Sequence, residues 1–155
     1  MGAADFRNHV SKKTYPKAED AFRAAVQQAQ YDHGHSGYTG TIAEKGDFVM
    51  LEVPPGLSVE TFIQTCMGGW SYEKEDIAVT ERREFASEEE AKAASWNGAF
   101  WLSEPGKWQA EVMVDVDPAT KAALRRAYDA IDDKWGPAGC VETDTEWVFF
   151  GWASE

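Results

Sequence analysis

Residues 31–45 hold the densest group of side chains that could do chemistry. Two of the three histidines, His33 and His35, lie in this segment, and imidazole is the side chain whose charge changes nearest neutral pH. Its three glycines allow positive φ and close approach by a ligand. The segment therefore predicts a site without specifying a reaction. The residues expected to contact a ligand are Tyr31, His33, His35, Ser36, Tyr38, Thr39, Thr41 and Lys45.

A purely structural role for the same residues stays open. Gly34 could be the residue that ends a helix near Tyr31 or Asp32. A histidine near a helix C-terminus also interacts favourably with the helix dipole without being catalytic. Gly37 and Gly40 could form a turn or bulge that leads into a strand.

Metal binding and acid–base chemistry are the two reactive alternatives. His33 and His35 would share one face of an extended segment, with Cys140 or an acid as a third metal ligand. The chain has no HExxH or CxxC pattern, so we expect no metal and no cofactor. Either histidine could instead act as a general acid–base on a phosphorylated or nucleotide substrate, with Lys45 stabilising negative charge. The chain also lacks a nucleophile elbow, a P-loop and a dinucleotide-binding fingerprint, which favours binding over catalysis.

Composition limits the partners. The 155 residues carry a net charge of −12, and clustered cations, which nonspecific nucleic-acid binding needs, are missing apart from Arg82–Arg83 and Arg125–Arg126. We therefore expect no direct nucleic-acid binding, and an acidic decoy that blocks a host nucleic-acid-binding protein is a further alternative. Two cysteines do not make a disulfide framework. No apolar run could span a bilayer and the first residues lack a signal peptide, so we expect a cytoplasmic protein.

Apolar spacing predicts the helices. The first should begin at Pro16, carry an apolar stripe from Ala18 to Ala29, and end at the 31–45 segment. Ser58 should cap a second helix that buries Cys66. Ser87 with Glu90 forms a capping box for a short third helix to about residue 95. Asp117 and Pro118 should start the last helix, with a stripe of Leu124, Tyr128, Ile131 and Trp135.

Alternating apolar residues predict the strands. A short strand or arm is expected within residues 1–15, and residues 38–44 and 48–53 should form a hairpin. Weaker alternation marks 77–80, and clearer alternation marks 100–102, 108–116, 140–142 and 146–152. The last of these is apolar on both faces, as in a central strand covered on both sides. Within it, Trp152 follows Gly151 and is a further candidate ligand contact.

These elements predict one α+β domain over residues 1–155. We expect a mainly antiparallel sheet of about five to seven strands packed with about four helices, because the strands come in adjacent pairs with helices between them. The oligomeric state cannot be inferred from the sequence.

Three segments resemble a family of small bacteriophage and prophage proteins. They are residues 2–6 (GAADF), residues 34–45 (GHSGYTGTIAEK) and residues 149–154 (FFGWAS). The resemblance implies a phage or mobile-element origin, and hence the host cytoplasm, but no particular activity. The resulting hypothesis is an accessory protein, with a role in counter-defence, that binds a small polar and nucleotide-like ligand through residues 31–45. A host protein is the alternative partner.

Overall fold

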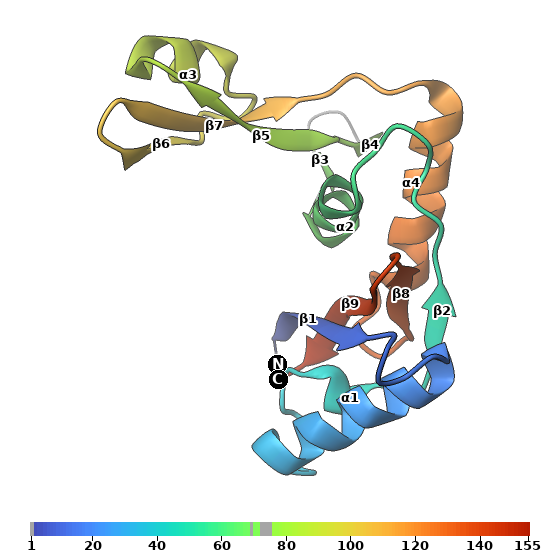
Figure 1. Cartoon of the computed structure of the whole chain (residues 1–155). Helices are drawn as coiled ribbons and strands as arrows, with labels where there is room; N and C mark the ends of the chain where they lie inside the picture. Colours follow the sequence, from blue (N-terminus) through green and yellow to red (C-terminus); the bar gives the residue numbers. More distant parts are fainter. Residues whose placement is uncertain (1, 69, 72–75) are drawn as a thin grey trace.

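The last strand of the chain lies at the centre of the main sheet in this computed structural model, which describes residues 2–68, 70–71 and 76–155. The sheet has the order β1-β9-β8-β2. Strand β9 (Glu146–Ser154) pairs antiparallel with β1 (Ala3–Ser11) on one side and with β8 (Ala138–Glu142) on the other. The first and last strands of the chain are therefore neighbours, and the termini lie together (Figure 1).

Strand β9 is apolar on both faces, and helices cover each face. Phe149 and Phe150 are adjacent, point to opposite faces, and are both 0% exposed. Phe149 packs with α1 (Ala18–His33) below the sheet in Figure 1, whereas Phe150 packs with α2 (Val59–Gly68) and α4 (Pro118–Ile131) above it. The prediction of a central strand covered on both sides is confirmed.

The hairpin expected at residues 38–53 is wrong. Residues 38–41 are irregular, and Ile42–Glu44 form the 3₁₀ turn η1. The Thr41 hydroxyl caps the start of this turn by accepting a hydrogen bond from the Ala43 N–H. Strand β2 (Phe48–Met50) instead pairs in parallel with β8. Alternating apolar residues predict that β2 is a strand. They do not predict its partner, because that strand lies about ninety residues further along the chain.

A second, three-stranded antiparallel sheet has the order β5-β7-β6. It contains β5 (Thr80–Phe85), β6 (Phe100–Glu104) and β7 (Lys107–Met113). Helix α3 (Glu88–Ala94) packs against this sheet, and Figure 1 shows the unit extending away from the main sheet. A two-stranded pair completes the strands: β3 (Trp70–Ser71) and β4 (Asp76–Ile77).

Side-chain caps begin three helices where the sequence predicts. Ser58, Ser87 and Asp117 each accept a hydrogen bond from the N–H three residues later. Helix α1 begins two residues after Pro16. The prediction that Trp135 ends the apolar stripe of α4 is wrong. That helix ends at Ile131, and Trp135 is 62% exposed. Within the described ranges, no helix is both long and apolar enough to cross a membrane.

The α+β class is confirmed, with four α-helices and mostly antiparallel strands in the described parts of the chain. Among the described residues, the strands are divided between the main sheet and two smaller ones, because β5, β6 and β7 pair there with one another and not with the main sheet. The main sheet and its helices form the part of the molecule that positions residues 31–45.

Replacing Phe149 with alanine should test the importance of the buried β9 faces. The ring is fully buried and contacts the rings of Phe22 and Phe48 at centroid distances of 5.6 and 5.5 Å. We expect Phe149→Ala to lower the free energy of unfolding by about 3–5 kcal/mol, measured by urea denaturation. Leu102→Ala, at a side chain that is 52% exposed, is the control and should change it by under about 0.5 kcal/mol.

Candidate functional site

Residues 31–45 begin as the end of a helix and continue as an irregular loop. Gly34, with φ of 85°, follows the last residue of α1 and donates its N–H to the Gln30 carbonyl at 2.8 Å. The helix-ending role that the sequence left open for Gly34 is therefore real. Gly37 and Gly40 also have positive φ, of 86° and 69°. All three conformations favour glycine for steric reasons, whether or not a ligand approaches.

Two of the hydroxyl groups expected to contact a ligand, those of Thr39 and Thr41, form hydrogen bonds within the loop. The Thr39 hydroxyl donates to the Glu44 carboxylate at 2.7 Å and lies 2.8 Å from the Thr41 hydroxyl. The Thr39 N–H also donates to Glu44, at 3.3 Å. These contacts hold the loop in shape, and they use hydrogen-bonding capacity that would otherwise be open to a ligand.

Lys45 anchors the loop to the segment that follows α4. Its side chain is only 5% exposed, and its ammonium donates to the carbonyls of Lys134 and Gly136 at 3.0 and 2.9 Å. Burial lowers the pKa of the Lys45 ammonium below its usual 10.5, while nearby carboxylates, Asp133 foremost, oppose that change. At least two of its three N–H donors are therefore used in structural contacts, which leaves little capacity for a bound phosphate.

The end of β9 fixes the other part of the loop. The Gly40 N–H donates to the Ser154 carbonyl at 2.8 Å, and the Ser154 hydroxyl donates to the Gly37 carbonyl at 3.3 Å. Five of the residues expected to contact a ligand are exposed, two at the end of α1 and three in the loop: Tyr31, His33, His35, Ser36 and Tyr38. The position of the exposed groups is thus set by the main sheet.

A hollow of about 520 Å³ lies between β1 and α1, and we call it the α1-side hollow. Residues 5–10 of β1 form one wall and the flank of α1 forms the other. Of the nine residues expected to contact a ligand, two line it, His33 and Thr41, where the loop closes one end. Trp152 lies half-buried on the opposite face of the sheet, with Phe150, so the structure does not bring it to the same place.

The polar groups of the α1-side hollow are mixed in charge. Besides His33 and Thr41, its polar side chains include Asn8, Gln28 and Asp32. The C-terminus of α1 lies here and contributes a negative partial charge. The His33 end of the hollow therefore offers neutral donors and acceptors and disfavours an anionic group, whereas Arg7 and His9 line the wall formed by β1.

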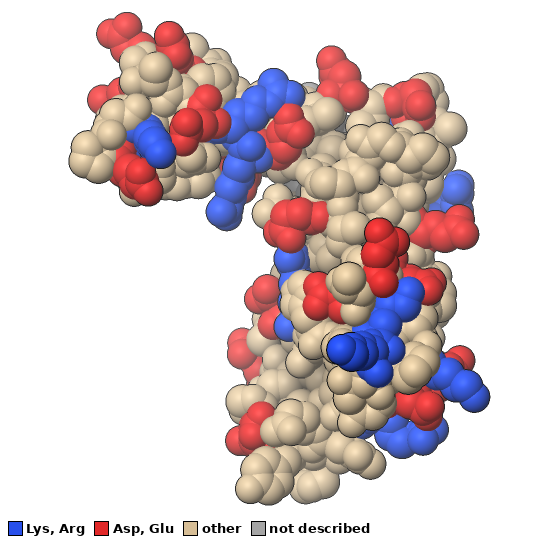
Figure 2. Space-filling model, viewed as in Figure 1, with Lys and Arg blue, Asp and Glu red and all other residues tan. Residues whose placement is uncertain are grey.

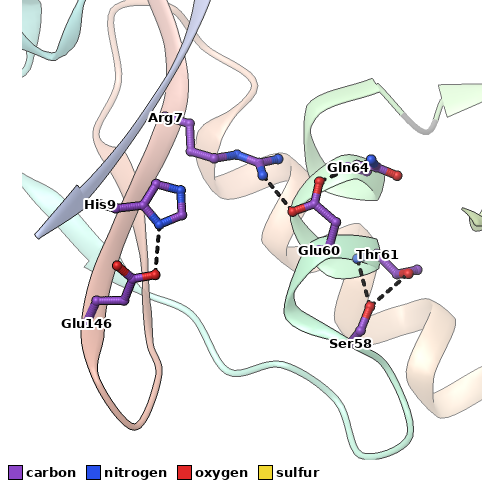
Figure 3. Close-up of polar contacts among 7 residues, drawn as sticks. All are labelled: Arg7, His9, Ser58, Glu60, Thr61, Gln64 and Glu146. Atoms are coloured by element: carbon purple, nitrogen blue, oxygen red, sulfur yellow. Dashed lines mark hydrogen bonds and ion pairs between the residues drawn. The ribbon is translucent and has the colours of Figure 1, made fainter. Parts of the chain in front are cut away.

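Odd-numbered residues of β1 point to the opposite face, towards α2. Arg7 donates to the Glu60 carboxylate at 2.7 Å, and Glu60 also accepts from Gln64 at 3.1 Å (Figure 3). His9 lies 3.0 Å from the Glu146 carboxylate. The alternation of β1 therefore directs this charged network towards the face opposite α1, although Arg7 and His9 also border the α1-side hollow.

A second hollow, of about 320 Å³, lies on that other face, and we call it the α2-side hollow. Arg7 and Gln64 line it together with Arg82, Trp96 and Glu111 from the three-stranded unit. The Trp96 Nε1–H is buried and has no hydrogen-bonding partner among the described residues. The sequence did not indicate this hollow, because its residues come from segments up to about a hundred positions apart and form no motif.

The residues considered as metal ligands do not lie together. Cys140, considered as a third ligand, is fully buried in the core beneath α1, whereas His33 and His35 are exposed. In the parts of the chain that the structure describes, no three potential ligands cluster. Neither imidazole has a hydrogen-bonded carboxylate or hydroxyl there either, so no catalytic pair is formed.

Comparisons with protein-family models, curated proteins and solved structures find no match to the chain.

The two thiols should be unreactive in the folded protein. Burial raises the pKa of Cys66 to about 12, and burial together with Glu142 raises the pKa of Cys140 to about 12. Since the thiolate is the nucleophile, a disulfide reagent at pH 8 should label neither cysteine natively and both after denaturation. Rapid native labelling of Cys140 would show that the core beneath α1 opens.

Replacing Lys45 with methionine should test its structural role. The change keeps most of the aliphatic stem but removes the donor to the Lys134 and Gly136 carbonyls. We expect Lys45→Met to destabilise the fold by roughly 1–3 kcal/mol in urea denaturation. Lys13→Met, at an exposed lysine, is the matched control and should change stability by under about 0.5 kcal/mol. An unchanged denaturation midpoint for Lys45→Met would leave the ammonium free for a ligand role.

Proposed function

We propose that this chain is a non-enzymatic binding protein of phage or mobile-element type that holds a small polar ligand in the α1-side hollow. The observation that carries the proposal is the meeting of His33 and Thr41, both expected from the sequence, at one end of that hollow. Its volume of about 520 Å³ lies within the usual range of small-molecule sites, roughly 300–1,000 Å³. Sequestering a host compound in this way would suit a counter-defence role.

The ligand class follows from the charges around the hollow. The α1 C-terminus and Asp32 disfavour an anion at the His33 end. Lys45, the cation expected from the sequence to bind a phosphate, is bound to main-chain carbonyls and does not line this hollow. A nucleoside, which offers hydroxyl and amide groups without a phosphate, suits this end better than a nucleotide does.

The same contacts support binding over catalysis. An acid–base role for His33 or His35 would need a partner that sets the tautomer and a group that stabilises developing charge. The described residues give neither imidazole such a partner, and Lys45 is buried. The acidic-decoy alternative has less support, because acids and bases are intermingled on the face of the molecule shown in Figure 2.

Replacing His33 with alanine should weaken ligand binding without unfolding the protein. The probes are adenosine, guanosine, cytidine and uridine with their 5′-monophosphates, measured by calorimetry and thermal shift. We expect one nucleoside to bind more tightly than its monophosphate. Loss of one hydrogen bond in His33→Ala should weaken that binding by roughly three- to tenfold.

His35→Ala is the matched control, since His35 is an exposed histidine two residues further along the chain that does not line the hollow. Both variants should keep the wild-type melting temperature. Equal weakening by both, or no binding of any probe, would contradict the proposal. Mass spectrometry of each probe after long incubation separates the alternatives, because a chemically altered probe would establish the enzyme instead.

A further inference from the structure

Strand β1 is a long edge strand with one unpaired side. It forms nine consecutive register pairs with β9, without a shift, and contains no proline. On its other side it pairs with no strand that the structure describes. Outward-facing N–H and C=O groups on such an edge are a template for another strand.

The space beside this edge is open on both faces of the sheet. The α1-side and α2-side hollows border the same three consecutive residues: Asp5, Phe6 and Arg7. Figure 1 shows β1 between α2 above and α1 below. An added strand would lie about 4.8 Å from β1 and would direct alternate side chains into the two hollows.

Charge makes the strand complementary to itself in one register. Asp5 and Arg7 lie on the same face of β1, on either side of Phe6. If two copies of β1 pair antiparallel with Phe6 opposite Phe6, Asp5 of each copy lies opposite Arg7 of the other. Opposite charges in such cross-strand pairs contribute roughly 0.2–1 kcal/mol each, and like charges destabilise.

The neighbouring registers that keep each residue on its face are disfavoured. Centring the pair on Arg7 places two guanidinium groups opposite each other, and centring it on Asp5 does the same with two carboxylates. Among these three registers, charge therefore favours the one centred on Phe6. The strand carries one acid and one arginine in a chain of net charge −12, and the acids Glu60 and Glu146 beside it lie against Arg7 and His9.

We propose that two copies of this chain pair through β1 in that register and join their main sheets into one eight-stranded sheet. Arg7 can keep its bond to Glu60 and bind Asp5 of the second copy as well, since a guanidinium has five N–H donors. Asn8 of the second copy would lie opposite Ala4, close to Gly40. The second copy thereby covers the open side of the α1-side hollow. This inference goes beyond the proposed function and does not depend on it.

Charge reversal on each side of the pair tests the proposal. Light scattering should give the wild type twice the 17.2 kDa chain mass at micromolar concentration. Asp5→Arg alone and Arg7→Asp alone place like charges opposite each other and should be monomeric. Mixed together, the two variants have every pair complementary and should form a heterodimer. Glu19→Arg, an exposed reversal away from the edge, should stay dimeric.

Circular dichroism checks that each variant is folded. Because a carboxylate at position 7 would face Glu60, the double variant Arg7→Asp/Glu60→Lys serves as the mixing partner if Arg7→Asp is unfolded. A monomeric wild type overturns the proposal. That result would instead be expected if the β1 edge binds a peptide of another protein. Dimers of Asp5→Arg alone, or folded variants that stay monomeric when mixed, overturn it equally.

Discussion

Burial of both faces of β9 is the constraint on which the rest of the structure depends. Phe149 belongs to the core beneath α1, and Phe150 belongs to the core shared with α2 and α4. Since adjacent strand residues point to opposite faces, β9 contributes side chains to both cores, as its neighbour β8 does with Cys140 on one face and Val141 on the other. Helices of both layers therefore pack on the central strand as well as on its neighbours β1 and β8.

The central position of β9 also decides which surfaces stay open. With β8 on one side and β1 on the other, β1 and β2 become the two edges of the main sheet. The end of β9 binds the 31–45 loop through Ser154, and β1 forms a wall of the α1-side hollow. The candidate site, its anchored loop and the free edge are thus consequences of one strand order.

The features that could be predicted from the sequence are those determined by residues close together in the chain. The caps at Ser58, Ser87 and Asp117 act within one helical turn, and the two apolar faces of β9 are visible in its alternation. The partner of β2 and the role of Lys45 depend on groups about ninety residues away, which no local pattern reveals. For the same reason, the sequence indicates residues 31–45 as a group of polar side chains. It does not indicate which of their donors form hydrogen bonds within the protein.

The α1-side hollow and the β1 edge are physically linked, because β1 belongs to both. In the proposed dimer the second copy covers the hollow beside Gly40, so a ligand that fits the covered hollow binds the dimer more tightly than the monomer. Linkage is reciprocal, and that ligand must then strengthen the association of the two copies by the same factor. A ligand too large for the covered hollow has the opposite effect and separates the copies. Ligand size, acting through a single edge strand, would therefore set the direction in which binding shifts the oligomeric state.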